Sequence, residues 1–188
     1  MNLVKLGLAS VLAATALFAG TYNVDASHSN VGFKVKHLMI SNVTGKFDKF
    51  SGSFDYNEKT NTLKSLTGDV EVESINTENE KRDGHLKSAD FFDASNHPKL
   101  TFKLDKVDGD TAYGKLTLRG VTKDVELDFE NNGTAVDPWG NKRVGLELSG
   151  KINRKDYGLN WNKGLEAGGV LVGEDVKLTI ELQGILAK

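Results

Sequence analysis

The architecture of this chain is set by the pattern in Gly114-Lys115-Leu116-Thr117-Leu118-Arg119-Gly120-Val121-Thr122-Lys123-Asp124-Val125-Glu126-Leu127-Asp128-Phe129. Apolar residues alternate with polar ones in both halves, as in Leu116-Thr117-Leu118 and in Leu127-Asp128-Phe129. Successive side chains of a strand point to opposite faces, so a period of two gives each strand one dry face and one wet face. The stretch therefore predicts two strands that each bury one face.

The same alternation recurs along most of the chain. Its apolar positions are Val31, Phe33 and Val35; Val70 and Val72; Leu100, Phe102 and Leu104; Val144, Leu146 and Leu148; and Val176, Leu178 and Ile180. Turn signals such as Asp108-Gly109-Asp110 and Asn131-Asn132-Gly133 separate several of these segments. With residues 50–56 added, the pattern predicts about eight strands at hairpin spacing, which is typical of an all-β sandwich or barrel.

The interior of such a protein has two possible contents. A closed barrel removes exposed strand edges, and with about eight strands its interior is either filled by side chains or holds one small ligand. The inward positions here are mostly Val, Leu and Phe, so any ligand held among them would be apolar. Periodicity alone favours the simpler alternative, in which these side chains fill their own core.

The first residues indicate where the protein is located. Lys5 precedes a short apolar stretch, Leu6 to Ala19, which is shorter than the roughly 20 residues that a membrane-spanning helix needs. A basic start, a short apolar region and small residues at its end are typical of a secretory signal peptide. We expect a signal peptide at 1–19 and one mature domain at 20–188, in the periplasm or secreted. The alternative is an uncleaved anchor or a buried helix.

Composition excludes several classes of function. Removing residues 1–19 takes away Lys5 and leaves 23 basic and 26 acidic residues, a formal charge of −3. This balance argues against nucleic-acid binding, which needs a basic surface. The chain contains no cysteine, so disulfides, thiolate metal ligands, cysteine nucleophiles and a lipid-modified cysteine are excluded.

One segment, residues 77–93, differs from the strand pattern and predicts a helix. Thr77 and Glu80 have the spacing of a capping box. Glu78 and Arg82 have the i,i+4 spacing of a favourable ion pair. The segment also gathers Arg82, Asp83, His85 and Asp90 beside Phe91 and Phe92. Such a cluster suits a catalytic site, the mouth of a pocket for an amphiphile or a purely structural connection.

Catalysis is the weakest of these three interpretations. His85 with Asp83 or Asp90 has the residue types of a general base, and Arg82 that of an oxyanion contact. However, residues two apart on a helix do not face each other, and the chain has no G-x-S-x-G nucleophile sequence. The four histidines are scattered without metal-ligand spacing, so we expect no metal or cofactor. Trp139 is expected to close a turn, and Trp161 to line or plug one end of the barrel.

Several motifs together resemble the YceI-like family. They are Val31-Gly32-Phe33-Lys34-Val35-Lys36-His37-Leu38, the stretch from Arg82 to Phe92, the stretch from Gly114 to Lys123, and Asp137-Pro138-Trp139-Gly140 with the five residues after it. They follow the family's order over essentially the whole mature chain. The resemblance implies a lipocalin-like antiparallel barrel with an inserted helix. It also implies binding of polyisoprenoids or related long-chain amphiphiles, a periplasmic location in many bacterial members, and dimers in some.

These observations lead to one set of expectations. The chain is an all-β, lipocalin-like antiparallel β-barrel of about eight strands with one inserted α-helix. We expect it to bind a long-chain isoprenoid or fatty amphiphile and to catalyse no reaction. A homodimer is one expected state, and the mature chain is not expected to insert stably into a membrane. The expected lining is Phe33, Val35, Phe102, Leu116, Leu118, Leu127, Phe129, Leu146 and Leu178, with Arg82 and His85 as polar contacts. The alternatives are a lipid-modifying enzyme that uses Arg82, Asp83 and His85, and an interaction module with a filled core.

Overall fold

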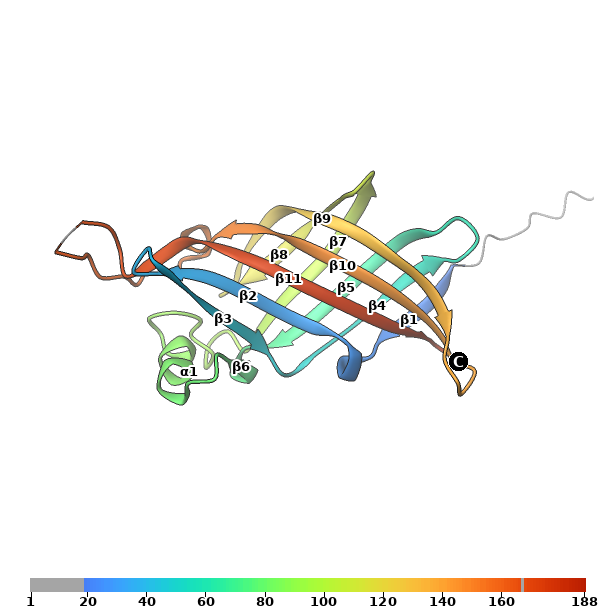
Figure 1. The fold of residues 1–188 in the computed structure, drawn as a ribbon, viewed down its shortest axis with the longest axis horizontal. Helices are drawn as coiled ribbons and strands as arrows, with labels where there is room; N and C mark the ends of the chain where they lie inside the picture. Colours follow the sequence, from blue (N-terminus) through green and yellow to red (C-terminus); the bar gives the residue numbers. More distant parts are fainter. Residues whose placement is uncertain (1–18, 167) are drawn as a thin grey trace, which may run out of the picture.

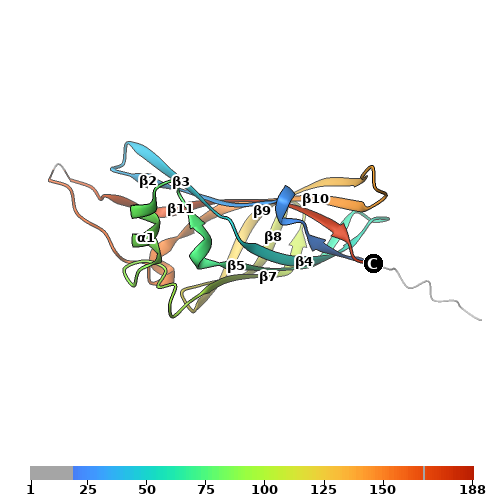
Figure 2. The same ribbon diagram turned by 90° about the horizontal axis from the view of Figure 1, so that it is seen from below.

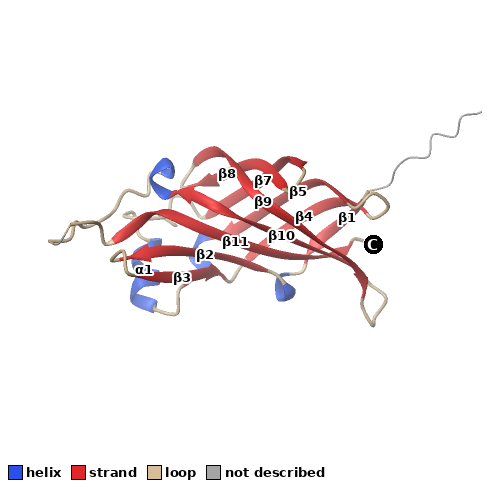
Figure 3. Cartoon of the chain, turned by 45° about the horizontal axis from the view of Figure 1, so that its top comes forward, coloured by secondary structure: helices blue, strands red, loops and turns tan. Residues whose placement is uncertain are grey.

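The structure, a computed structural model, describes residues 19–166 and 168–188; the expected signal peptide therefore lies outside the described residues apart from Ala19. Its strands are β1 (Gly20–Val24), β2 (Asn30–His37), β3 (Ser41–Phe47), β4 (Phe50–Asn57), β5 (Thr62–Glu71), β6 (Ile75–Asn76), β7 (Lys99–Asp108), β8 (Thr111–Leu118), β9 (Val121–Val136), β10 (Lys142–Asn153) and β11 (Val172–Leu186). The α-helix is α1 (Glu80–Lys87), and the short 3-10 helices are η1 (Ala26–His28), η2 (Val72–Ser74) and η3 (Arg154–Tyr157). Strands form most of the molecule (Figure 3).

Eight of the strands close into an antiparallel barrel (Figure 1). Their order is β1-β4-β5-β7-β8-β9-β10-β11, and the pairing of β1 with β11 completes the ring. Because closure pairs the first strand with the last, these strands have no exposed edge left along that contact. The predicted barrel is thus confirmed, and a sandwich is not formed.

One edge of β11 is shared by two strands. Residues 184–186 pair with β1, and residues 172–181 pair with β2. Since η1 separates β1 from β2, the chain continues along β11 after a short break. At the β2 end, β2 pairs with β3, whose other edge pairs with only the two residues of β6. The barrel is therefore less completely closed at the end formed by β2 and β3.

An insertion, residues 72–98, lies at this end of the barrel. It contains η2, β6 and α1, and it lies beside β2 and β3, away from the C-terminus (Figures 1 and 2). The Val72 amide donates to the Pro98 carbonyl oxygen at 2.9 Å, which holds the two ends of the insertion together. The predicted inserted helix is confirmed, although it is only eight residues long.

The predicted capping box of α1 is wrong. The N-cap is Asn79, whose side-chain oxygen accepts from the Arg82 amide at 3.0 Å. Thr77 instead bonds to Asp83, whose carboxylate accepts from both the amide and the hydroxyl of Thr77. Asn at an N-cap supplies the same acceptor as Ser or Thr, so the helix begins two residues later than the Thr-x-x-Glu spacing indicated.

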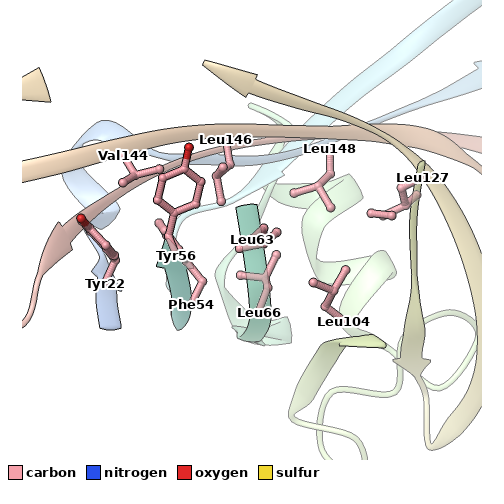
Figure 4. Packing of buried hydrophobic residues seen from close by; sticks show 11 residues of the cluster. Tyr22, Phe54, Tyr56, Leu63, Leu66, Leu104, Leu127, Val144, Leu146 and Leu148 are labelled. Atoms are coloured by element: carbon pink, nitrogen blue, oxygen red, sulfur yellow. The ribbon is translucent and has the colours of Figure 1, made fainter. Parts of the chain in front are cut away.

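The buried side chains form two clusters. One lies at the β1 end and includes Tyr22, Phe54 and Tyr56 together with Leu146 (Figure 4). The Tyr22 ring stacks on Phe54 at a centroid distance of 5.4 Å and meets Tyr56 edge-on at 6.3 Å. The other cluster lies at the α1 end and includes Phe47, Val72 and Tyr157. We give the name floor to four residues of the first cluster, Tyr22, Phe54, Tyr56 and Leu146, which fill the barrel at the end opposite α1.

Among the described residues, no helix combines the length and the apolar character needed to cross a bilayer.

Candidate functional site

A cavity of about 200 Å³ lies inside the barrel. Its wall is almost wholly apolar and comes from the inward faces of all eight barrel strands and of β2 and β3, with Leu86, Phe91 and Phe92 from the insertion. Its volume is several times the ~30 Å³ that one water molecule occupies in the liquid, and apolar cavities of this kind do not hold water well. Side chains therefore do not fill the barrel core completely.

The structure gathers most of the predicted lining residues around this cavity. Those that line it are Phe33, Val35, Phe102, Leu116, Leu118, Leu127 and Leu178. Phe129 and Leu146 are not among the residues that line the cavity; Leu146 belongs to the floor, and Phe129 packs against the first cluster. Alternation therefore predicted the inward face of each strand, but not which of the inward residues border the cavity.

Aromatic side chains lie against glycines of the adjacent strand. Phe33 is the register partner of Gly45, and its ring covers the space that a Cβ would occupy there. A Cβ at Gly114 would likewise lie 2.6 Å from the Phe102 ring. Because glycine has no side chain, each ring lies close to the wall, and the lumen stays open. The sequence signal for this arrangement is a glycine at an inward position of an alternating strand.

The floor closes the cavity at one end. Leu66 and Leu182 are lining residues, whereas Tyr22, Phe54 and Tyr56 lie beyond them and are almost completely buried. The Phe54 ring covers Gly184, and the Tyr22 hydroxyl donates to the Glu58 carboxylate at 2.7 Å. Burial is the largest cause of the raised pKa of Tyr22, with its bond to Glu58 adding to it. A chain entering the cavity from the α1 end would stop here.

The opposite end carries a group that we name the aromatic cap: His85, Phe91 and Trp161. The His85 ring meets Phe91 and Trp161 edge-on, at centroid distances of 5.0 and 4.8 Å. Phe91 lines the cavity, while His85 lies behind it and bonds through Nε2 to Asp90 Oδ2 at 2.9 Å. Trp161 thus lies at the barrel end, and Trp139 lies in a turn with 81% of its surface exposed.

Arg82 and Asp83 both bond to Thr77 at the start of α1. The Arg82 guanidinium donates through Nε to the Thr77 hydroxyl at 2.7 Å and through Nη2 to the Thr77 carbonyl at 2.8 Å. Asp83 bonds to the same threonine, which is buried. Arg82, Asp83 and Thr77 therefore form one clamp at the start of α1, and Asp83 does not pair with His85.

Arg154 was not predicted, yet it is the buried cation of the site. It is 4% exposed and lines the cavity at the α1 end, close to Leu159 and Val172. Burial lowers the pKa of its guanidinium, although an arginine stays protonated at neutral pH. No sequence signal distinguishes Arg154 from the solvent-exposed Lys155 and Asp156 that follow it.

Within residues 19–166 and 168–188, no group of three His, Cys, Asp or Glu side chains is placed to hold a metal ion.

The chain is similar to a known domain family, to relatives in sequence and to solved structures. The YceI-like domain family matches residues 22–184. A UPF0312 protein of Staphylococcus aureus strain N315 is 43% identical over 157 residues, covering 83% of this chain and 92% of that protein. A solved YceI protein of Campylobacter jejuni is 35% identical with a TM-score of 0.67, covering 87% of this chain and 96% of that one.

Two more distant solved structures share the fold. BcnA of Burkholderia cenocepacia is 21% identical with a TM-score of 0.71, covering 85% of this chain and 98% of that chain. A polyisoprenoid binding domain from Saccharophagus degradans, implicated in plant cell wall breakdown, is 18% identical with a TM-score of 0.68, covering 88% of this chain and 98% of that chain. At these identities the likeness concerns the fold alone.

Proposed function

We propose that this chain, which belongs to the YceI-like domain family, binds a long-chain amphiphilic lipid with its apolar tail inside the barrel. The observation that carries the proposal is the apolar cavity between the floor and the aromatic cap. Binding would be driven by burial of the tail, at about 25 cal/mol for each Å² of apolar surface removed from water. A polyisoprenoid or the tail of an isoprenoid quinone has the required chemistry.

The tail would point toward the floor, and the head group would lie at the α1 end. Support comes from the closed packing of Tyr22, Phe54 and Tyr56 at one end and from the polar groups of Arg154, His85 and Asp90 at the other. The distant Saccharophagus degradans neighbour is described as polyisoprenoid-binding, which supports this class of tail. It does not identify the residues of this chain that would bind the tail.

The biological role we propose is transport, storage or sequestration of this lipid in the periplasm. The support for the location is the signal-like segment 1–19. A homodimer belongs to the same proposal and rests on the resemblance to the family. Fractionation of the producing cells and size-exclusion chromatography with light scattering test the location and the dimer.

Native mass spectrometry of protein purified from its own host tests the binding proposal. We expect a bound species whose mass, after organic extraction, matches a long-chain lipid. The delipidated protein should take up a chain of this kind again. A wild-type protein that carries no lipid and takes up none would overturn the proposal and favour an interaction module.

We propose no catalytic activity. Arg82 and Asp83 are both bonded to Thr77, so the cluster that an enzyme would use is instead part of a structural clamp. Incubation with lipid esters and isoprenoid phosphates should leave them unchanged. Reproducible turnover that disappears in His85→Ala would favour the lipid-modifying enzyme.

A further inference from the structure

Arg154 occupies an unusual position for an arginine. It is the first residue of η3, directly after β10, and only 4% of its surface is exposed. It forms part of the cavity wall next to Leu159, at the end nearest α1. An ionised group in apolar surroundings is costly unless charged or hydrogen-bonding partners compensate it.

The partners of Arg154 are backbone carbonyls. Its Nε donates to the Gly173 carbonyl oxygen at 2.8 Å, Nη1 donates to Leu159, and Nη2 reaches the Val172 carbonyl only at 3.5 Å. A guanidinium has five N–H donors, so these three acceptors leave donors over, and the Nη2 bond is at the limit of a hydrogen bond. In the part of the chain that the structure describes, no ion pair involves Arg154, and nearby Glu174 pairs with Lys155 instead.

We propose that Arg154 binds the head group of the lipid, and that this head group is an anion, either a carboxylate or a phosphate monoester. The proposal rests on the proposed function, because it names the class of lipid that the same cavity takes. A guanidinium matches both anions, since it offers two parallel N–H donors to two oxygens. The weakly bonded Nη2 side is the one that turns to the ligand.

This placement also agrees with the direction of the tail. The apolar wall extends from Arg154 and Leu159 past Phe102 to Leu66 and the floor. A head group held at Arg154 lets the tail follow that wall to its closed end. The bound anion would supply a direct ion pair, which the guanidinium lacks among the described residues because Glu174 acts on it only from a distance and pairs with Lys155.

Matched ligand pairs test the proposal with delipidated wild-type protein. The pairs are hexadecanoic acid against hexadecanol and farnesyl monophosphate against farnesol, measured by calorimetric or fluorescence titration. We expect the anion of at least one pair to bind about 10- to 100-fold tighter than its alcohol, as hydrogen bonds to a charged partner provide. The pair with the larger ratio identifies the carboxylate or the phosphate.

Substitution then assigns the preference to Arg154. In Arg154→Gln the ratio of anion to alcohol affinity should fall to about one, while the alcohol still binds; Arg154→Lys should keep part of the preference. The matched control is Arg119→Gln, because Arg119 also donates to backbone carbonyls at this end, those of Gly158 and Ala89, but does not line the cavity. Its ratio should stay as in the wild type.

Each result separates this inference from the proposed function. Equal wild-type affinities for anion and alcohol overturn the anionic head group and leave lipid binding intact. A ratio that survives in folded Arg154→Gln overturns the role of Arg154. Binding of neither member of either pair overturns the proposed function itself. If Arg154→Gln does not fold, the wild-type pairs and the loss of hexadecanoate affinity as its carboxyl group protonates at low pH still decide the first point.

Discussion

Gly52 and Gly68 face each other as register partners on the inner wall of β4 and β5, but they tolerate a side chain very differently. A Cβ at Gly68 would meet nothing closer than the Ser51 carbonyl oxygen at 3.8 Å. A Cβ at Gly52 would lie 2.5 Å from the Thr67 carbonyl oxygen. Both glycines line the cavity, so the pair offers one position that can be filled and one that cannot.

Gly68→Val should therefore reduce lipid uptake without loss of stability. The added methyl groups enter the space that we assign to the tail, and valine replaces a glycine whose flexibility costs a strand about 0.5–1 kcal/mol. The melting temperature of delipidated protein should be unchanged or higher, while the affinity for hexadecanoate falls.

The control for this prediction is Gly52→Ala. Its Cβ would press on backbone, and overpacking of this kind costs about 1–3 kcal/mol in stability. A large drop in the melting temperature of Gly68→Val, with lipid affinity unchanged, would mean that the wall at Gly68 is packed and that the tail does not reach it.

The aromatic cap should report binding through fluorescence. The chain has two tryptophans, of which Trp161 contacts Phe91 on the cavity wall and Trp139 is exposed. A lipid titration should change the emission of Trp161 because the ligand enters beside its ring. Trp161→Phe should abolish the change, and Trp139→Phe should preserve it. The opposite result for the two variants would place the entrance away from α1.

Acid should lower the stability of the fold, because it protonates carboxylates in a polar network outside the cavity. Arg143 Nη1 bonds to Asp25 at 2.7 Å and its Nε to Asp137 at 2.8 Å, with little exposure of these side chains. Hydrogen bonds, first from Ser27 and then from Arg143, hold the pKa of Asp25 well below its usual range. Asn141 and then Arg143 do the same for the pKa of Asp137.

The direction in which stability changes with pH follows from these lowered pKa values. A carboxylate with a lower pKa in the folded state stabilises the protein above its unfolded pKa, near 3.9 for Asp, and this contribution is lost as the pH falls toward the folded pKa. Asp137→Asn should therefore lower the melting temperature at pH 7 and reduce its further fall between pH 5 and pH 3. Asp108→Asn, at an exposed pair with Lys106, should behave as the wild type at both pH values.

Export should remove residues 1–19. The first strand begins at Gly20, and Tyr22 already belongs to the floor, so a mature chain that begins at Gly20 keeps every residue of the barrel. N-terminal sequencing of fractionated protein should read Gly-Thr-Tyr. A chain that still begins at Met1 in the membrane fraction would contradict the signal peptide and favour an anchor.

The strands and the inserted helix could be predicted from local patterns in the sequence. The alternation around Leu116, Leu118 and Leu127 predicted strands with one apolar face, because side-chain direction in a strand follows from the backbone alone. The inserted helix was predicted in the same way, although Asn79 rather than Thr77 caps it. These properties depend on residues a few positions apart, which is why they can be predicted without a fold.

Only the tertiary structure decided which inward side chains line the cavity and which ones pack together and close its end. Phe33 and Phe129 have the same alternating pattern, but Phe33 lines the cavity and Phe129 packs against the first cluster without lining it, because the neighbours of an inward side chain depend on the register between strands. Gly68 faces Gly52 of the neighbouring strand, and Arg154 bonds to the Gly173 carbonyl of β11, so their surroundings depend on strand pairing. Closure itself joins Tyr22 to Leu186, and such long-range pairing is set by the packing of the whole barrel and not by any local pattern.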